Sequence, residues 1–271
     1  MKTDVTKGTC NVAYKYIKTS QDGSAFIITF NRPERRNAIS VATMDELIDA
    51  AQTADAIPEV RGVILTGGMD YFSAGADLND ALAISGAADG LAYFKRWHRL
   101  CDVYENLTKP VFAAIEGFCM TGGCEFAMAC DIRIAAEDAT FAITSSKIGT
   151  VAGAGGTQRL ARLVGPSKAI EIMFAADPID ATEAHRIGLV NRKVAKGTAV
   201  EEAKKMIKVY ENRAPLSLAF IKRVVYRGLQ MDLASSLEFE AFLVTTIYGS
   251  QDRKEGISAF LEKRPAKFTG K

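Results

Sequence analysis

The amino-acid sequence predicts an α/β fold followed by a helical C-terminal region. Short apolar runs typical of strands alternate with helical patterns as far as about residue 195, which favours βαβ units. From residue 200 onward, the apolar residues recur almost wholly with helical spacing. We therefore expect a disordered N-terminus at 1–11, an α/β core at 12–195 and a helical region at 196–271.

The elements of the core are predicted from apolar spacing and from the residues that bound each run. Asp-Gly-Ser within 21–24 favours a turn between two strands, and Ser40 can cap the helix that follows it. Glycine-rich turns at 121–123 and 153–156 each precede a helical run. The expected order is strands at 12–18 and 25–31, a helix at 40–57, a strand at 60–66, a helix at 91–107, strands at 111–115, 132–135 and 141–143, and helices at 153–162, 168–175 and 182–187.

Four helices are expected in the C-terminal region, and two of them carry an extensive apolar face. Apolar surface of this extent on terminal helices needs a partner, either the core or another subunit. The helices are expected at 200–212, 216–230, 233–248 and 252–263, with the apolar faces on the second and third.

The composition of the 271 residues argues against several functional classes. The net charge of +2, from 34 basic and 32 acidic residues, gives no electrostatic basis for binding nucleic acid or an anionic membrane. No apolar run approaches the ~20 residues that a spanning helix needs, and residues 1–16 lack the apolar segment of a signal peptide. We therefore expect a cytoplasmic protein with no nucleic-acid or membrane partner.

The five cysteines do not form a disulfide pattern, because their number is odd and the chain is long. Cys119, Cys124 and Cys130 lie close in sequence, but their spacing differs from zinc-binding patterns and the residues between them are mostly apolar. We expect buried free thiols in a reducing compartment and no metal site.

The segment Thr121-Gly122-Gly123-Cys124-Glu125 is the strongest candidate for a chemical site. Two glycines at a strand-to-helix turn free backbone N–H groups to face a negative charge at the positive end of a helix. Amide donors beside a carboxylate suit a reaction that builds charge on a carbonyl oxygen while a proton moves. The alternative is a tight connection in which Glu125 is only an acidic residue at a helix start.

A second candidate is the loop Ser73-Ala74-Gly75-Ala76-Asp77-Leu78, which leaves backbone amides uncovered. The amides of Ala76 and Gly122 can together form a two-donor oxyanion hole. The alternative is an ordinary turn that Asp77 caps. The turn at 153–156 lacks phosphate-loop and dinucleotide-binding spacing, so we expect close packing there. His98 is first interpreted as a hydrogen-bonded structural residue, with a pocket-lining role as the alternative.

A set of motifs runs along the chain from about residue 12 to its end. They are Asn31-Arg32-Pro33, Asn37-Ala38, Ala74-Gly75-Ala76-Asp77-Leu78, Lys109-Pro110-Val111, Gly122-Gly123-Cys124-Glu125, Cys130-Asp131-Ile132-Arg133, Gly153-Ala154-Gly155-Gly156-Thr157-Gln158-Arg159-Leu160, Gly188-Leu189-Val190 and Lys263-Arg264. Each motif is weak alone, but in this order they strongly resemble the enoyl-CoA hydratase/isomerase family, the crotonases.

The resemblance implies a crotonase-like fold, in which repeated ββα turns form two roughly perpendicular sheets and C-terminal helices assemble a trimer or a hexamer. It implies acyl-CoA thioester substrates, with coenzyme A as part of the substrate and no metal or redox cofactor. The thioester oxygen would lie between the amides of Ala76 and Gly122, and the reaction would pass through an enolate. The residues that the resemblance places around coenzyme A or the acyl group are Ala74, Ala76, Asp77, Leu78, Asn79, Gly122 and His98.

One position departs from the family pattern. Typical hydratases place two glutamates around one water, and the resemblance maps the first on Glu125 and the second on Ser145. No acidic residue lies between Ala139 and Ile170, so a small shift of the match does not restore the second carboxylate. A serine hydroxyl can hold a water, but it is no carboxylate base near neutral pH.

The pair Trp97-His98 resembles a pair in a relative that displaces a halide from an aryl-CoA ester. The position matching that relative's aspartate nucleophile is Gly153, which argues against dehalogenation. The pair nevertheless strengthens the pocket-lining interpretation of His98.

Three functions follow from the residues and the resemblance together. The first is an acyl-CoA lyase that hydrates an unsaturated acyl-CoA, a cyclic or conjugated one included, with Glu125 as the acid/base and Ser145 as a water- or substrate-positioning group. The second is an isomerase that shifts a double bond with Glu125 alone. The third is a non-catalytic scaffold that binds CoA or RNA, against which the presence of Glu125 and the near-neutral charge argue.

Overall fold

The computed structural model describes residues 13–271, and two β-sheets organise its core. The disorder expected at 1–11 and the strand start expected at residue 12 lie outside the described residues. In the larger sheet, β1 is antiparallel to β2 and every other neighbouring pair is parallel. Its strands, in spatial order, are β1 (Ile17–Asp22), β2 (Ala25–Phe30), β3 (Gly62–Thr66), β5 (Val111–Ile115), β7 (Ile132–Ala136) and β10 (Arg192–Val194).

The smaller sheet contains four short strands. Three of them run parallel to one another, and the fourth is antiparallel to its neighbour. In spatial order the strands are β4 (Tyr71–Ser73), β6 (Phe118–Met120), β8 (Thr140–Ala142) and β9 (Ile179–Asp180).

The chain passes between the two sheets in three successive turns. β3 leads into β4, β5 into β6 and β7 into β8, so each turn gives its first strand to the larger sheet and its second to the smaller. Because β4, β6 and β8 are parallel neighbours, their carboxyl ends lie at one edge of the smaller sheet. The loops that follow these three strands therefore meet at that edge.

Helices cover both faces of the larger sheet, which explains why β3 and β5 are buried along their whole length. Ile64 of β3 packs with Ala203 and Ile207 of α8, whereas its neighbours Val63 and Leu65 belong to the larger apolar cluster beneath α1, α3 and α4. The helices of the core are α1 (Val41–Ala56), α2 (Leu78–Leu82), α3 (Ala87–Asn106), α4 (Gly122–Ala127), α5 (Gly156–Val164), α6 (Pro166–Ala175), α7 (Ala181–Arg186) and α8 (Ala199–Tyr210), with 3₁₀ turns η1 (Pro33–Arg35) and η2 (Ser145–Ile148).

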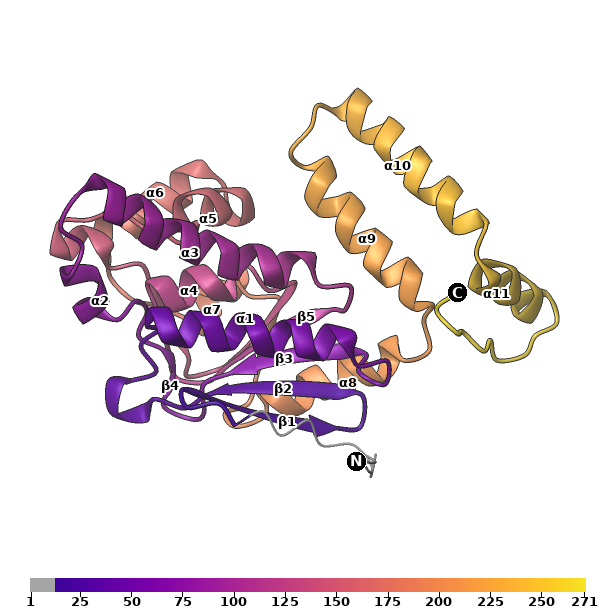
Figure 1. Ribbon diagram of the computed structural model, residues 1–271, viewed down its shortest axis with the longest axis horizontal. Coiled ribbons are helices and arrows are strands. Elements are labelled where there is room, and N and C mark those ends of the chain that lie inside the picture. Colours follow the sequence, from indigo (N-terminus) through magenta and orange to yellow (C-terminus); the bar gives the residue numbers. More distant parts are fainter. Residues whose placement is uncertain (1–12) are drawn as a thin grey trace, which may run out of the picture.

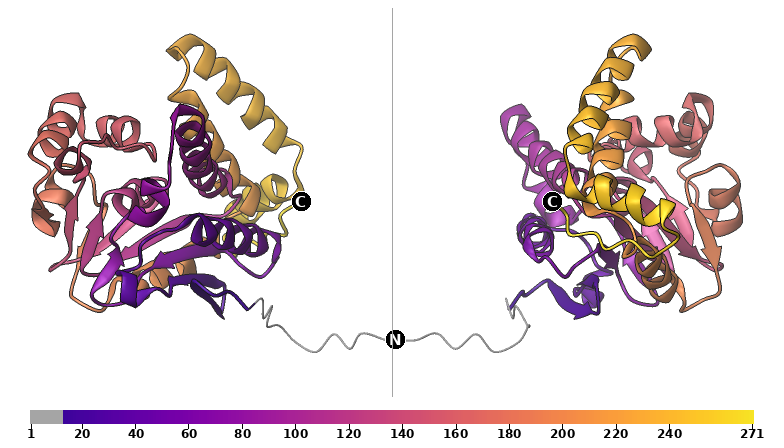
Figure 2. Two further views of the ribbon diagram at one scale, coloured as in Figure 1. Left: turned by 60° about the vertical axis from the view of Figure 1, so that its left-hand side comes forward. Right: turned by 90° about the vertical axis from the view of Figure 1, so that its right-hand side faces the viewer.

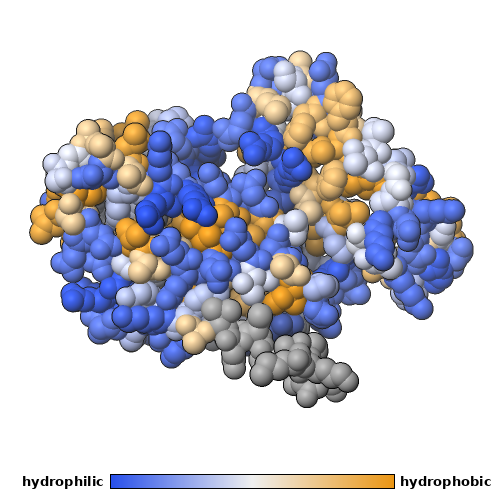
Figure 3. All heavy atoms as spheres, viewed as in Figure 1, coloured by the Kyte–Doolittle hydropathy of each residue, from blue (hydrophilic) through white to orange (hydrophobic). Residues whose placement is uncertain are grey.

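The last three helices lie apart from these layers. α9 (Pro215–Gly228) and α10 (Leu233–Tyr248) form a hairpin that projects from the core, and α11 (Gln251–Leu261) lies beyond it (Figures 1 and 2). No residue of α9 or α10 is buried. Apolar side chains gather on the α9–α10 hairpin (Figure 3). The large exposed ones are Ile221, Val225, Leu229, Met231, Leu233, Leu237, Phe242, Val244 and Tyr248.

Most of the expected elements are confirmed, and the main error concerns the first strand. The helix expected at 40–57 is α1, and the Ser40 hydroxyl accepts the Thr43 amide as its cap. The strand expected at 12–18 is wrong, because pairing with β2 starts at Ile17 and continues to Asp22, leaving two residues for the turn. Five elements are not expected from the sequence, and they have two to five residues each, too few to produce a recognisable period. They are α2, β4, β6, β9 and β10.

The packing of α8 concerns the expected division of the chain into an α/β core and a helical C-terminal region. Although the sequence groups α8 with the terminal helices, its apolar face covers the larger sheet. Between residues 13 and 271, no helix is both long enough and apolar enough to cross a membrane.

Candidate active site

Three loops at the carboxyl ends of β4, β6 and β8 form the candidate active site. They carry Ala76, the pair Gly122 and Glu125, and Ser145, respectively. These residues are far apart in sequence, and the parallel pairing of the three strands brings their loops to one edge.

The carboxylate of Glu125 is buried and only partly satisfied. Glu125 lies in the first turn of α4 and is 2% exposed. Its Oε2 accepts hydrogen bonds from the amides of Ala154 at 2.7 Å and Gly156 at 2.8 Å. Its Oε1 has no hydrogen-bond partner among the described residues. This oxygen is still partly accessible to solvent. Burial raises the pKa of Glu125, while the two amides and the more distant Arg159 charge partly oppose that rise.

The turn at 153–156 supplies the two amides that hold Glu125. An ideal Cβ on Gly156 would lie 2.7 Å from Cγ of Glu125, so only glycine brings this backbone close enough. The side chain of Arg159 fixes the turn by donating to the carbonyl of Ala154 at 3.1 Å, and it is held in turn by Glu105 at 2.6 and 2.9 Å. The close packing expected of this turn therefore has a specific purpose, the restraint of one carboxylate oxygen.

The amides of Ala76 and Gly122 lie beside each other. An ideal Cβ on Gly122 would be 3.1 Å from the Ala76 nitrogen, and one on Gly75 would be 2.9 Å from the Gly122 nitrogen. Gly75, with φ of +100°, makes the close approach possible. The backbone groups on either side of Ala76 are the Gly75 carbonyl and the Asp77 amide, and both hydrogen-bond to Ile39. Because successive groups of an extended backbone alternate in direction, the Ala76 N–H points to the opposite side of the chain. Neither amide has an acceptor among the described residues.

Thr121, directly before Gly122, holds a strained backbone conformation. Its φ of 44° and ψ of −116° lie in a region that a β-branched residue rarely adopts. Its hydroxyl hydrogen-bonds the Thr144 hydroxyl at 2.8 Å and accepts the Thr144 amide at 3.3 Å. The loop after β6 is thereby tied to the loop after β8, and no local signal in the sequence indicates this contact.

Ser145 follows Thr144 and is 5% exposed. Its hydroxyl has no hydrogen-bond partner among the described residues and is not fully shielded. The adjacent Ser146, by contrast, is exposed, and its hydroxyl donates to the Met173 carbonyl at 3.0 Å. The Ser145 hydroxyl therefore remains available to a ligand.

Asp77 acts as the cap of α2. Its Oδ1 accepts the Asn79 amide at 3.1 Å, and its Oδ2 accepts from Arg32 at 2.9 Å. Burial tends to raise the pKa of Asp77, but the hydrogen bonds and charge of Arg32 lower it overall. Leu78 and Asn79 are exposed, and Ala74 and Ala76 are half-buried, so this segment is open at the surface.

The two residues of the Trp97-His98 pair lie in different environments, one in the interior and one at the surface. Trp97 is buried, and its ring would lie 3.0 Å from a Cβ on Gly122. His98 is exposed, and its Nε2 donates to the Gly153 carbonyl at 2.9 Å. His98 thus contacts the turn that restrains Glu125, which agrees with the first interpretation of a hydrogen-bonded structural residue.

The four described cysteines, Cys101, Cys119, Cys124 and Cys130, are buried free thiols, as expected; Cys10 lies outside the described residues. Within residues 13–271, no group of three or more His, Cys, Asp or Glu side chains is placed to hold a metal ion.

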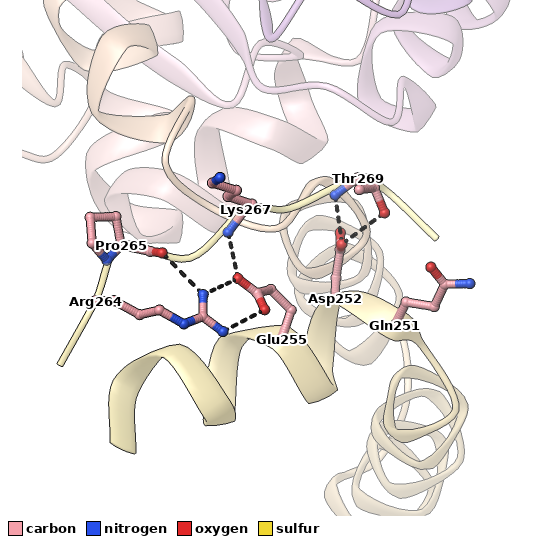
Figure 4. A pocket seen from close by; sticks show the side chains of 7 residues that line it. All are labelled: Gln251, Asp252, Glu255, Arg264, Pro265, Lys267 and Thr269. Carbon is pink, nitrogen blue, oxygen red and sulfur yellow. Dashed lines mark hydrogen bonds and ion pairs between the residues drawn. The ribbon is translucent and has the colours of Figure 1, made fainter. Parts of the chain in front are cut away.

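A hollow of about 560 Å³ lies far along the chain, at α11 (Figure 4). Its acidic groups already have partners within the chain. Glu255 pairs with Arg264, and Asp252 accepts the Thr269 amide at 2.6 Å. We interpret this hollow as the polar contact that holds the last residues against α11, because its carboxylates are not left free for a ligand.

The chain belongs to the enoyl-CoA hydratase/isomerase family. The family model matches residues 20–271. The chain is 38% identical to a crotonyl-CoA hydratase of Syntrophomonas wolfei, with 96% of this chain and 100% of the relative covered. It is 39% identical to a short-chain-enoyl-CoA hydratase of Clostridium acetobutylicum, with 90% and 94% covered.

Solved structures agree with this assignment and show that the fold is the crotonase fold. An enoyl-CoA hydratase from Bacillus anthracis superposes with a TM-score of 0.89 at 32% identity, covering 95% of this chain and 100% of the other. A putative enoyl-CoA hydratase/isomerase family protein from Hyphomonas neptunium superposes with a TM-score of 0.87 at 37% identity, covering 95% and 98%.

Proposed function

We propose that the protein catalyses the reversible addition of water to an enoyl-CoA thioester. Relatives named crotonyl-CoA hydratase and short-chain-enoyl-CoA hydratase support this reaction. One observation carries the proposal: the Glu125 carboxylate is held through one oxygen and unpartnered at the other, in the first turn of the helix that begins at Gly122.

In the proposed mechanism, the amides of Ala76 and Gly122 donate to the thioester carbonyl oxygen. Negative charge develops there as water adds to C3, and two amide donors stabilise it. Oε1 of Glu125 accepts the proton of the water and delivers a proton to C2. Burial supports this exchange, because it raises the pKa of Glu125 from its ordinary value toward the range of a group that gains and loses protons easily.

Ser145 bears on which acyl group the proposed reaction prefers. A hydroxyl in place of a second carboxylate positions water or the acyl group but does not take up a proton. We therefore propose that the preferred acyl group is cyclic or conjugated, because its own conjugation helps to stabilise the enolate. Coenzyme A enters only as part of the substrate, along the open segment 74–79.

The alternative within the family is an isomerase that shifts a double bond. A single carboxylate can remove a proton at one carbon and return it at another, and the unpartnered Oε1 of Glu125 favours this candidate. A non-catalytic scaffold that binds CoA or RNA is the third candidate.

Incubation of the protein with crotonyl-CoA and with a cyclic dienoyl-CoA, followed by mass spectrometry, distinguishes the three. Hydration adds the mass of one water to the ester. Isomerisation leaves the mass unchanged but shifts the ultraviolet spectrum of the acyl group. A scaffold turns over neither ester, and that result would contradict the proposal.

We also propose that the protein works as a trimer or hexamer in the cytoplasm. The exposed apolar side chains of the α9–α10 hairpin support an assembly, because surface of this kind is unfavourable in water.

A further inference from the structure

One face of α3 packs against the turn at 153–156. An ideal Cβ on Gly153 would lie 2.3 Å from the Phe94 ring, so this ring and the backbone of the turn are in direct contact. One helical turn further along α3, Nε2 of His98 donates to the Gly153 carbonyl at 2.9 Å. A carbonyl oxygen only accepts, so Nε2 carries a proton. Among the described residues no other donor reaches this carbonyl, and His98 alone holds it.

The Gly153 carbonyl belongs to the same peptide group as the Ala154 amide. This amide donates to Oε2 of Glu125 at 2.7 Å. The peptide bond is trans, so its C=O and its N–H point in opposite directions. His98 and Glu125 therefore lie at the two ends of one chain of hydrogen bonds, which runs from Nε2 through a single peptide group to the carboxylate.

The second amide that holds Glu125 has a different support. It is the amide of Gly156, and the carbonyl of its peptide group is that of Gly155. The Gly155 carbonyl accepts two backbone amides in the first turn of α5, at 2.8 and 3.1 Å. Backbone groups thus hold this second peptide, whereas a side chain, that of His98, holds the first. A substitution at His98 can therefore weaken the support of one amide and leave the other intact.

The peptide group between these two is held by Cys101 and Arg159. Both donate to the Ala154 carbonyl, at 3.5 and 3.1 Å respectively. Neither changes its charge in the pH range in which a carboxylate titrates, because burial raises the pKa of Cys101 to about 12 and an arginine stays protonated. They fix the shape of the turn, but the peptide group that they contact does not donate to Glu125. Among the described residues, His98 is the side chain that contacts one that does.

We propose that His98 is a positioning residue for Glu125, because its hydrogen bond to the Gly153 carbonyl orients and strengthens the Ala154 amide that holds the carboxylate. The inference rests on the proposed function, in which Glu125 transfers the proton. Hydrogen bonds in a chain polarise one another, most of all where water is largely excluded, and Glu125 is 2% exposed. His98 acts through Glu125 and not on the substrate. Its loss should therefore disfavour the ionised form of Glu125 and slow turnover, while acyl-CoA binding stays the same.

Two variants at position 98 separate the hydrogen bond from the rest of the side chain. The amide nitrogen of His98→Gln can donate to the same carbonyl, whereas His98→Leu has no donor, and neither new side chain titrates. The ester is crotonyl-CoA or the cyclic dienoyl-CoA, whichever the unmodified protein hydrates. We expect His98→Leu to lower kcat about three- to tenfold with KM changed less than about twofold, and His98→Gln to restore most of the loss.

The pH profile of the same variants gives a readout that a merely structural role would not move. The acid side of the kcat/KM profile should lie about half a pH unit higher in His98→Leu than in His98→Gln, since a weaker amide donor stabilises the Glu125 carboxylate less. Arg99→Leu is the matched control, because Arg99 is the next residue of α3 and is exposed. It should leave both kcat and the profile unchanged.

Infrared titration of the ligand-free proteins measures the same effect without activity. The band of the protonated Glu125 carboxyl is identified by its absence from Glu125→Gln, and its midpoint should lie higher in His98→Leu than in His98→Gln. Equal midpoints, or equal kcat values, in the two His98 variants would overturn the inference. If the midpoints differ as expected but the unmodified protein hydrates neither ester, the proposed function fails and the hydrogen-bond role of His98 stands.

Discussion

At the scale of single residues, the two oxygens of Glu125 have different surroundings. Oε2 accepts two backbone amides, which fix the position of the side chain, while Oε1 is left for a ligand. A group that transfers protons must be positioned accurately and still have a free lone pair, and this division provides both. The arrangement explains why the turn at 153–156 belongs to the site although it carries no reactive side chain.

We expect Glu125→Gln to retain acyl-CoA binding but to lose turnover by roughly 10²–10⁴-fold, because the amide oxygen can still accept both backbone N–H groups but cannot carry the proton. Steady-state kinetics and titration with the same ester measure the two effects separately. Glu171→Gln, a change at an exposed carboxylate on α6, is the control. A Glu125→Gln enzyme with near-normal kcat would exclude Glu125 as the acid/base.

The raised pKa of Glu125 predicts the acid side of the pH profile. Since the carboxylate must be ionised to accept a proton from water, and burial disfavours the ionised form, kcat/KM should fall at a higher pH than the ordinary glutamate value of 4.5. The measurement is kcat/KM for crotonyl-CoA from pH 4 to 8, with unfolding monitored in parallel. A fall centred at or below 4.5 would contradict the assignment.

Ser145→Glu should increase crotonyl-CoA hydration and decrease activity on the preferred ester. The new carboxylate would share the water with Glu125, but it would also fill the space that the hydroxyl leaves open to the acyl group. Ser146→Glu is the matched control, because Ser146 is adjacent and exposed. Unmodified protein that already hydrates crotonyl-CoA at ~10³ s⁻¹, the upper end of usual turnover, would show that Ser145 imposes no constraint.

At the scale of elements, the sequence predicts the parts of the site that arise locally. The glycines at 122 and 123 and the small residues at 74–76 indicate turns with uncovered amides. The structure has a loop at 74–77, and α4 begins at Gly122 directly after the turn. The capping role considered for Asp77 is also present. These features depend on neighbouring residues, so a reading of the sequence alone can recognise them.

The contacts that align the loops do not follow from local sequence. Arg32 reaches Asp77 across 45 positions, and Thr121 reaches Thr144 across 23. Trp97 is assigned to a helix by its spacing, but only the packed structure shows that its ring lies against Gly122. Such contacts depend on how strands pair between turns, and strands of three residues give too little periodicity to predict that pairing.

Lys222 of α9 provides a test at this scale, because it anchors the α9–α10 hairpin. Its Nζ pairs with Asp131 at 2.9 Å, and Tyr226 donates to the same carboxylate at 2.9 Å. We expect Lys222→Met to destabilise the protein by about 2 kcal/mol, since it leaves the half-buried Asp131 charge without its cation. Denaturant unfolding measures the loss, and Lys205→Met, at an exposed ion pair, should cost less than about 1 kcal/mol. Equal effects of the two changes would show that the Lys222–Asp131 pair is no anchor.

At the scale of the whole molecule, the distribution of apolar surface separates the core from the projecting hairpin. The core buries its apolar residues between the sheets and helices, whereas α9 and α10 have none that is buried. In the proposed assembly, this hairpin would gain stability from contact with another copy of the chain. The two apolar faces expected from sequence lie on its helices.

We expect sedimentation to show a trimer or hexamer at micromolar concentration. Phe242, on α10, is 74% exposed, and Phe242→Glu should shift the protein toward smaller species while circular dichroism shows that it remains folded. Phe174→Glu, at an exposed phenylalanine on α6 of the core, is the matched control. A monomeric unmodified protein at that concentration would contradict the expectation.

The passage of the chain from one sheet to the other has a consequence for how such a protein can change over evolutionary time. Ala76, Gly122 with Glu125, and Ser145 follow the second strands of three different turns. A substitution after β8 can therefore alter how water or an acyl group is handled while the segments after β4 and β6 keep their form. A scaffold of this design can acquire a new reaction by a change at a single loop end, and Ser145 lies at one such end.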